Sequence, residues 1–304
     1  MLKYGEFKQG LIRELKRCVG MHQRILGEYE ITEIGTVYTN NMEMEGIEVH
    51  KKDSRIGVLL YPQEIYIRYL QGEKLKDILD NWVRKFLKEV DKLPETEKIW
   101  RIWEHSKTRA TIALINRERN KNFLKEIPWR KLGETDLAIG YVIPLNTTSI
   151  YFVKNIMLNE WGITEDELYR SAFQNLQEEK GTFAAGRFMV SKGALEWETI
   201  DLLKEQGFRY DPLRIYYISV DRQYGAAACM NERLMASVRC LLGEEFMLLP
   251  FDVNTMVIAK VDIPEIVDKN LRFMEEIEKY NGEPRIYLSN KAHLWRQGKL
   301  SIME

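Results

Sequence analysis

Apolar residues recur along this 304-residue chain with two different periods, and segments with the two periods alternate. Across residues 6–26 they recur every three or four positions, which predicts a helix lying on a core. Ile47 and Val49 alternate with charged neighbours, residues 51–55 form a polar turn, and alternation resumes over residues 56–60. This second pattern predicts a β-hairpin. Together the two patterns favour a fold in which helices cover a sheet.

The rest of the chain continues this alternation. Pro62 suits the first turn of a helix that ends at Gly72, and a further helix is expected at residues 74–90. Thr164 and Glu167 form a capping box, which predicts a helix that begins near Thr164. The other expected strands are residues 110–115, 137–143, 149–153, 215–220, 246–250, 255–261 and 285–288, and the other expected helices are residues 119–127, 226–242 and 264–280.

Helices separate most of the expected strands outside the hairpins. This order favours an α/β fold, with α+β as the alternative, built on a mixed sheet that helices cover. The length corresponds to one or two domains, and Pro94 with its charged neighbours marks a candidate boundary. We therefore expect an N-terminal helix–hairpin–helix portion at residues 1–95 and a larger α/β portion at residues 96–304. The two portions are either separate domains or share one core.

Charge balance and cysteine content limit the function classes. The chain has 45 basic and 46 acidic residues, so it lacks the basic excess of a general polyanion-binding protein. Three scattered cysteines are too few for a disulfide framework and suit a reducing compartment. The charged N-terminal segment does not fit a signal peptide, and the apolar run at residues 137–145 is too short to cross a membrane. We expect a cytoplasmic protein without a membrane partner.

Sequence signatures of metal and nucleophile chemistry are weak. The sequence has no CxxC, HExxH or GxSxG motif and its four histidines are dispersed, so we expect no metal site and no cofactor. Cys18 and His22 lie four positions apart on one helix face, where an imidazolium would lower the pKa of the thiol and create a nucleophile. The alternative, which we favour, is that both side chains pack in the core.

Two glycine-containing segments are candidates for phosphate binding. Residues 181–187, GTFAAGR, have two glycines but lack the Lys–Ser/Thr pair of a P-loop. The YGAAAC segment around Gly225 follows an expected strand and is expected to open a helix, where backbone N–H groups are able to bind an anion. Small residues also let a helix pack closely on a sheet, and we favour this packing role for Gly225.

The segment from Lys98 to Lys131 carries ten basic and three acidic residues. Trp100, Trp103 and Trp129 are interleaved with the basic residues, a combination that binds single-stranded nucleic acid by charge and stacking. The alternative is that the tryptophans are buried and the charges form a solvated face. We favour this alternative and expect no nucleic-acid partner.

Five longer segments are distinctive in combination: NNMEMEGIEVHKKDS (residues 40–54), LINRERNKNFLKEIPWR (114–130), NEWGITEDELYRSAFQN (159–175), GAAACMNERLMASVRCLLGEEFMLLP (225–250) and YLSNKAHLWRQGKL (287–300). In this order they resemble an uncharacterised bacterial family, the domain-of-unknown-function 5688 family. The resemblance spans nearly the whole chain and implies a single α/β unit, but no activity, cofactor or catalytic residue. The chain departs from the family pattern between Glu178 and Glu198, and its Lys98–Lys131 segment is more basic.

Polar residues that follow two of the expected strands are the candidate ligand-binding residues, because ligands often bind where strands end and loops begin. Asn and Asp at such positions also shape turns. The candidates are Asn116, Arg117 and Asn120 after one strand, and Asp221, Arg222 and Gly225 after another.

Our first hypothesis is a non-catalytic binding or interaction protein with a small ligand or a protein partner, because the usual nucleophile, metal and phosphate signatures are missing. The alternative is an enzyme with an unrecognised thiol- or hydrolase-like site. A second alternative is nucleic-acid binding through Lys98 to Lys131. A cavity that gathers a thiol, an imidazole or several carboxylates with shifted pKa values would favour the enzyme.

Overall fold

The computed structural model describes residues 2–26, 29–39, 42–52, 57–90, 102–144, 150–191, 194–205, 207–250, 252–265, 267–270, 272 and 288–303. The chain divides into two compact units, Met1–Ile102 and Trp103–Glu304. The boundary expected near residue 95 lies outside the described residues. Helices and antiparallel sheets together confirm a mixed fold of the α+β class. Among the described helices, none has the length and apolar character needed to span a membrane.

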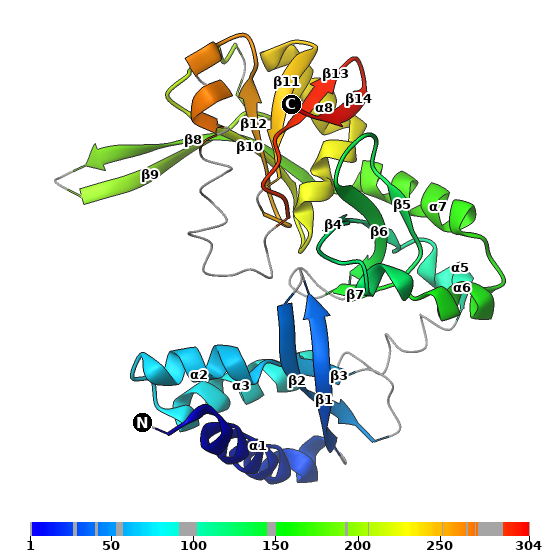
Figure 1. Ribbon diagram of the computed structural model, residues 1–304, viewed down its shortest axis with the longest axis vertical. Coiled ribbons are helices and arrows are strands. Elements are labelled where there is room, and N and C mark those ends of the chain that lie inside the picture. The colour runs from blue at the N-terminus through cyan, green and yellow to red at the C-terminus, as the bar shows by residue number, and fades with distance from the viewer. Residues whose placement is uncertain are drawn as a thin grey trace. The chain divides into compact units, whose positions relative to one another are not determined.

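The first unit contains helices and a three-stranded antiparallel sheet in the order β1–β2–β3 (Figure 1). The expected apolar stripe of the first helix is present, since Phe7, Leu11 and Leu15 are fully buried. Ile47 and Val49, on one face of β2, are fully buried as well. The elements are α1 (Tyr4–Leu26), β1 (Tyr29–Thr39), β2 (Met42–Lys51), β3 (Gly57–Leu60), α2 (Pro62–Leu70) and α3 (Leu75–Val90).

The strand β1 corrects the expected helix–hairpin–helix arrangement. The predicted hairpin corresponds to β2 and β3, but β1 precedes it and pairs with β2 along its length. The register of β1 shifts between Ile34 and Thr36. A bulge of this kind interrupts the two-residue alternation on which strand prediction depends, so the sequence pattern did not identify β1.

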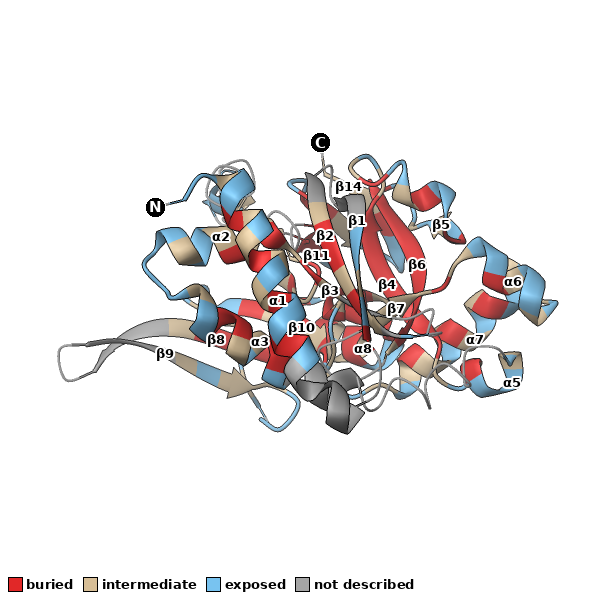
Figure 2. Cartoon of the chain, turned by 90° about the horizontal axis from the view of Figure 1, so that it is seen from below, coloured by how far each residue is buried: buried red, intermediate tan, exposed pale blue. Residues whose placement is uncertain are grey.

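The second unit contains a seven-stranded antiparallel sheet in the order β14–β13–β11–β12–β10–β8–β9 and a four-stranded sheet in which β6 pairs with β4, β5 and β7. Residues of β4 and β6 are almost all buried, as Figure 2 shows. The strands are β4 (Thr111–Asn116), β5 (Trp129–Lys131), β6 (Leu137–Pro144), β7 (Ile150–Phe152), β8 (Gly181–Ser191), β9 (Ala194–Asp201), β10 (Ile215–Val220), β11 (Glu245–Leu249), β12 (Met256–Lys260), β13 (His293–Arg296) and β14 (Lys299–Ile302).

Helices cover these sheets. α7 contacts β4 and β6, and α8 contacts β8 and β11 through a buried apolar stripe. A separate core cluster of Met247, Leu249, Ala259 and Ala292 includes residues of β11 and β12. The described helices are α5 (Trp103–Ser106), α6 (Asn155–Trp161), α7 (Glu165–Glu178) and α8 (Glu232–Leu242), with short 3₁₀ helices at Phe123–Lys125 and Gly225–Met230.

Several sequence expectations need correction in this unit. The helix expected at residues 226–242 is a 3₁₀ helix followed by α8, which begins only at Glu232 because Asn231 caps it. The helix expected at residues 119–127 is turn with one short 3₁₀ segment. The GTFAAGR segment is part of strand β8 and forms no phosphate loop. The described part of the helix expected at 264–280, namely residues 264–265, 267–270 and 272, is helical, and the rest of it, with most of the strand expected at 285–288, lies outside the described residues.

Candidate functional site

The candidate residues that follow β4 shape the turn after the strand. Asn116 Oδ1 accepts a hydrogen bond from the Arg119 backbone N–H at 2.9 Å, and Asn120 Nδ2 donates to the Asn116 carbonyl at 2.9 Å. The Arg117 backbone N–H donates to the Asp136 carbonyl at 2.8 Å. Because Asn116 and Asn120 are buried, their amides hold the backbone of this turn and are not presented to a ligand from solvent.

A buried hydrogen-bond network around the Asp136 carboxylate lies beside this turn. Its Oδ2 accepts from Asn116 Nδ2 at 3.1 Å and from Ser289 Oγ at 2.8 Å, and its Oδ1 accepts from His293 Nε2 at 3.0 Å. All four residues are buried, with Asp136 only 3% exposed. Nδ1 of His293 is buried without a hydrogen-bond partner among the described residues. The network therefore joins the end of β4, the start of β6 and the C-terminal segment.

Aspartate, histidine and serine meet in this network, but not as a nucleophilic triad. In a triad the serine hydroxyl donates to the histidine, which is then oriented by the aspartate. Here the Ser289 hydroxyl and the His293 imidazole both bind the Asp136 carboxylate. All three side chains are also shut off from solvent. This geometry suits a structural tie between segments.

Arg222 and Asp221 follow β10. The side chain of Arg222 is 6% exposed and donates to the Glu179 carboxylate at 2.7 Å and to the Ile112 carbonyl at 2.6 Å. Burial lowers the pKa of Arg222, against the opposing effect of Glu179. Asp221 is half-exposed and contacts the side chains of Lys180 and Thr182. Arg222 is therefore occupied by protein partners.

Gly225 is required by close packing. A Cβ atom at this position would lie 2.5 Å from the carbonyl oxygens of Val220 and Asn254 and 2.4 Å from the Ser219 hydroxyl. Real Cβ atoms do not approach backbone oxygens this closely, and only glycine lets the chain pass here. This contact supports the packing role favoured for Gly225.

The structure does not bring the two groups of candidates together. The Arg222 side chain donates hydrogen bonds to the Thr111 hydroxyl and the Ile112 carbonyl, where β4 begins, whereas Asn116 is the last residue of β4. A strand of this length separates its ends by roughly 16 Å at about 3.3 Å per residue. The six candidate residues therefore do not form one site.

The Cys18–His22 pair is only partly described. The thiol of Cys18 is buried in α1 and lies 3.9 Å from Asp80 and from Arg17, and burial raises its pKa. The side chain of His22 lies outside the described residues. A buried thiol with a raised pKa is a poor nucleophile, so Cys18 itself has the properties of a core residue.

Several basic residues of the Lys98–Lys131 segment form ion pairs with acidic residues. Lys121 binds Glu118 at 3.1 Å, Lys131 binds Glu134 at 2.6 Å, and Arg130 binds Glu165 on α7. Trp103 packs against Trp161 in a tilted arrangement with ring centroids 5.4 Å apart and is only partly buried, Trp129 is 37% exposed, and Trp100 lies outside the described residues. The expectation that the tryptophans are buried is therefore wrong for Trp103 and Trp129.

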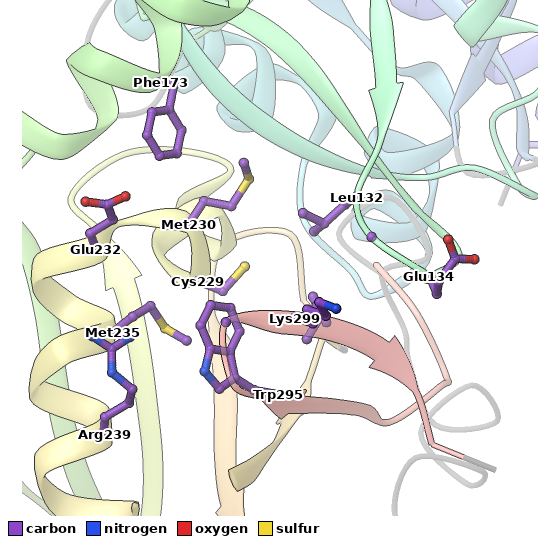
Figure 3. Close-up of a pocket in the computed structure, with 13 residues that line it drawn as sticks. Leu132, Glu134, Phe173, Cys229, Met230, Glu232, Met235, Arg239, Trp295 and Lys299 are labelled. Carbon is purple, nitrogen blue, oxygen red and sulfur yellow. The ribbon is translucent and has the colours of Figure 1, made fainter. Parts of the chain in front are cut away.

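A cavity of about 510 Å³ opens in the second unit between α8, the loop from β5 to β6, and the β13–β14 hairpin (Figure 3). We call it the Cys229 cavity. In Figure 3 the α8 side chains lie on one side, Leu132, Glu134 and Lys299 lie on the other, and Cys229 and Trp295 lie between them. Its lining residues are Leu132, Gly133, Glu134, Phe173, Cys229, Met230, Glu232, Met235, Arg239, Trp295, Gly298, Lys299 and Leu300.

Local structure explains how these walls are held. Trp295 and Leu300 are a cross-strand pair of the β13–β14 hairpin and so share a face of the sheet. The Glu134 backbone N–H donates to the Leu300 carbonyl at 3.0 Å and fixes the β5–β6 loop to β14. Gly133 has φ +53° and a Cβ there would lie 2.5 Å from the Leu300 carbonyl oxygen, so glycine permits this approach. The hydrogen bond between His293 and Asp136 also ties this loop to β13.

The chemistry of the cavity is mainly apolar. Leucine, methionine, phenylalanine and tryptophan supply six of the thirteen lining residues, and most of the lining surface is apolar. The Cys229 thiol is 2% exposed, and burial raises its pKa to about 12, so it is protonated at neutral pH and poorly nucleophilic. Two smaller hollows in this unit, of about 270 and 460 Å³, have a higher share of polar and charged lining. Within the described residues no cluster of His, Cys, Asp and Glu could hold a metal ion.

Sequence reasoning identified little of this cavity. Cys229 belongs to the small-residue segment that was weighed as a phosphate site, but the other lining residues were not singled out. Asp136 carried a usable signal, since it is a polar residue directly before an expected buried strand. His293 was noted only as one of four dispersed histidines, and Ser289 was not singled out.

Comparison with known families gives one match. The family model described as a family of unknown function, DUF5688, matches residues 4–297. No curated protein and no solved structure matches the sequence.

Proposed function

The chain belongs to the DUF5688 family, whose function is unknown, and we propose that it is a non-catalytic binding protein for a small, largely apolar molecule. The observation that carries this proposal is the Cys229 cavity, with its volume of about 510 Å³ and its mainly apolar lining. Small-molecule sites are typically concave, mostly apolar and roughly 300–1,000 Å³ in volume. The cavity fits this description in size and chemistry.

The state of the reactive side chains supports binding without catalysis. The cavity holds a thiol, but its pKa is raised by burial, which is opposite to what a nucleophilic cysteine needs. His293, which lies two residues before the lining residue Trp295 on β13, binds Asp136 and is buried. The alternative of a thiol- or hydrolase-like enzyme has less support from these residues, and the experiment below tests it together with the proposal.

We further propose that the protein acts in the cytoplasm. Its three cysteines are free thiols, and one of them, Cys240, is exposed. Free thiols persist in a reducing compartment, whereas an oxidising compartment favours their conversion to disulfides.

Binding of the neutral apolar dye Nile red tests the proposed function. We expect saturable binding with an increase in dye fluorescence, because the dye leaves water for the cavity. Leu132→Trp places a larger side chain at the cavity wall and should abolish this binding. Leu213→Trp adds the same side chain at a position that is 80% exposed and outside the lining, and should leave binding unchanged.

Three outcomes would count against the proposal. Absence of saturable binding to the wild-type protein would reject it, and equal binding by the Leu132→Trp variant would place the dye elsewhere. Chemical conversion of the bound Nile red, detected by mass spectrometry after incubation, would favour the enzyme alternative. We expect the dye to be recovered unchanged.

A further inference from the structure

The charged residues around the Cys229 cavity differ in how well their charge is already neutralised. Glu134 is bound to Lys131 at 2.6 Å, and its side chain is 82% exposed. Glu232 lies exposed in the first turn of α8, where the positive end of the helix dipole offsets a negative charge. Lys131 therefore offsets the negative charge of Glu134, and the helix dipole and water offset that of Glu232.

The positive charges of the two basic lining residues, Arg239 and Lys299, are less well neutralised. The side chain of Arg239 is 34% exposed, and its one ion pair among the described residues, to Glu244, spans 3.9 Å between Nε and Oε1. That separation is too long for a hydrogen bond. Lys299 is exposed and has no ion pair within the described residues. A half-buried guanidinium with unused donors is a strong binding group for a carboxylate.

Arg239 also stands in a suitable place for such a group. Glu232, Met235 and Arg239 follow one another at spacings of three and four residues, so they share the face of α8 that lines the cavity. Met235 and the apolar residues opposite it form the interior, and Arg239 lies at one end of this face (Figure 3). A molecule in the cavity would meet apolar groups along most of its length and a cation at one end.

We infer that the ligand of the Cys229 cavity is an amphipathic anion, with an apolar body in the cavity and a carboxylate bound by Arg239. Lys299 adds a second positive charge to the lining from the β14 side. This inference rests on the proposed function, because it names the class of molecule that the same cavity binds.

Competition against Nile red tests the inference, with decanoate, decanol and decylamine as probes below their aggregation concentrations. The three share one apolar chain and differ in the charge of the headgroup. For the wild-type protein we expect decanoate to displace the dye at about tenfold lower concentration than decanol, as a charge-assisted hydrogen bond implies. Decylamine should be the weakest competitor.

Charge reversal at Arg239 provides the specific control. Arg239→Glu should reverse the order, so that decylamine displaces the dye better than decanoate. Arg233→Glu changes the charge on the same helix by the same amount, but Arg233 is exposed and outside the lining, so the order should stay as in the wild type. Arg239→Gln, which removes the positive charge without introducing a negative one, should bring decanoate to the level of decanol if the Glu variant does not fold.

The outcomes separate this inference from the proposed function. Nile red binding with equal displacement by decanoate and decanol would leave the cavity as a binding site and overturn the anionic ligand. An equal effect of Arg233→Glu and Arg239→Glu would overturn the pairing with Arg239. Absence of Nile red binding and of displacement would reject the proposed function itself.

Discussion

Asp136 is held by donors from segments that are far apart along the chain, namely Asn116 on β4 and Ser289 and His293 near the C-terminus. Burying an ionised carboxylate is unfavourable unless hydrogen bonds replace its water. Three donors to one carboxylate meet this requirement. Burial alone would raise the pKa of Asp136, but hydrogen bonds from His293 and Ser289 outweigh it and hold the pKa below its ordinary value.

This lowered pKa predicts how Asp136 contributes to stability at different pH values. A carboxyl group with a lower pKa in the folded chain contributes fully above its unfolded pKa of about 3.9, and the contribution is lost as the pH falls through the folded pKa. We expect Asp136→Asn to lower the free energy of unfolding at neutral pH by roughly 1.5–3 kcal/mol. The difference from the wild type should shrink below about pH 4. Urea denaturation at a series of pH values measures it.

Asp221→Asn is the matched control for this prediction. Asp221 is half-exposed and forms a surface ion pair with Lys180 at 3.5 Å. Such pairs contribute at most about 1 kcal/mol, so this variant should remain close to the wild type at neutral pH. Equal stability of Asp136→Asn and the wild type at neutral pH would show that the buried network adds nothing to the fold.

At the scale of elements, the start of α8 is fixed by one buried side chain. Asn231 Oδ1 accepts from the Leu234 backbone N–H at 3.1 Å, and its Nδ2 donates to the Leu176 carbonyl at 2.8 Å. The residue is 1% exposed. Asn231 therefore caps α8 and also ties it to the end of α7.

Removing this cap should destabilise the protein. We expect Asn231→Ala to lower the free energy of unfolding by about 1–3 kcal/mol, since a cap and a buried hydrogen bond are lost together. Asn231→Ser keeps a capping oxygen without the amide donor and should be intermediate. Thr164→Ala removes the exposed cap of α7, which has no second role of this kind. A loss for Asn231→Ala no larger than that for Thr164→Ala, by urea denaturation, would contradict the double role.

Elements with a complete local signal were predictable. The capping box at Thr164 and Glu167 marks the start of α7, and α2 and α3 begin and end near the expected residues. The start of α8 was misplaced because the helix-compatible alanines of the YGAAAC segment form a 3₁₀ turn whose tight approach to β10 is decided by tertiary packing. The strands β13 and β14 are four residues each, too short for alternation to identify them.

The candidate site was less predictable than the fold. Asn116 and Arg222 were expected to bind a ligand because they follow strands, but their side chains bind the protein's own backbone and carboxylates. The Cys229 cavity combines residues from 132 to 300, which no sequence window contains. Its apolar lining looks like ordinary core sequence, because only the fold decides which apolar side chains face a cavity.

At the scale of the whole molecule, the distribution of ion pairs decides what the basic segment can do. A net charge of −1 gives no general attraction for a polyanion. In the second unit the basic residues Lys107, Lys121 and Lys131 each bind an acidic residue three positions away. A strand of nucleic acid would have to displace these acids while gaining little from the molecule as a whole.

We therefore expect no salt-sensitive binding of fluorescein-labelled polyuridylate in a gel-shift assay at low ionic strength. The triple substitution Glu104→Gln, Glu118→Gln and Glu134→Gln removes the acidic partners of Lys107, Lys121 and Lys131 without touching the basic residues, and it should create or strengthen weak binding. Such binding should fall as salt rises, because phosphate contacts release counterions. Wild-type binding that weakens steeply with salt would contradict the prediction and restore the nucleic-acid alternative for Lys98 to Lys131.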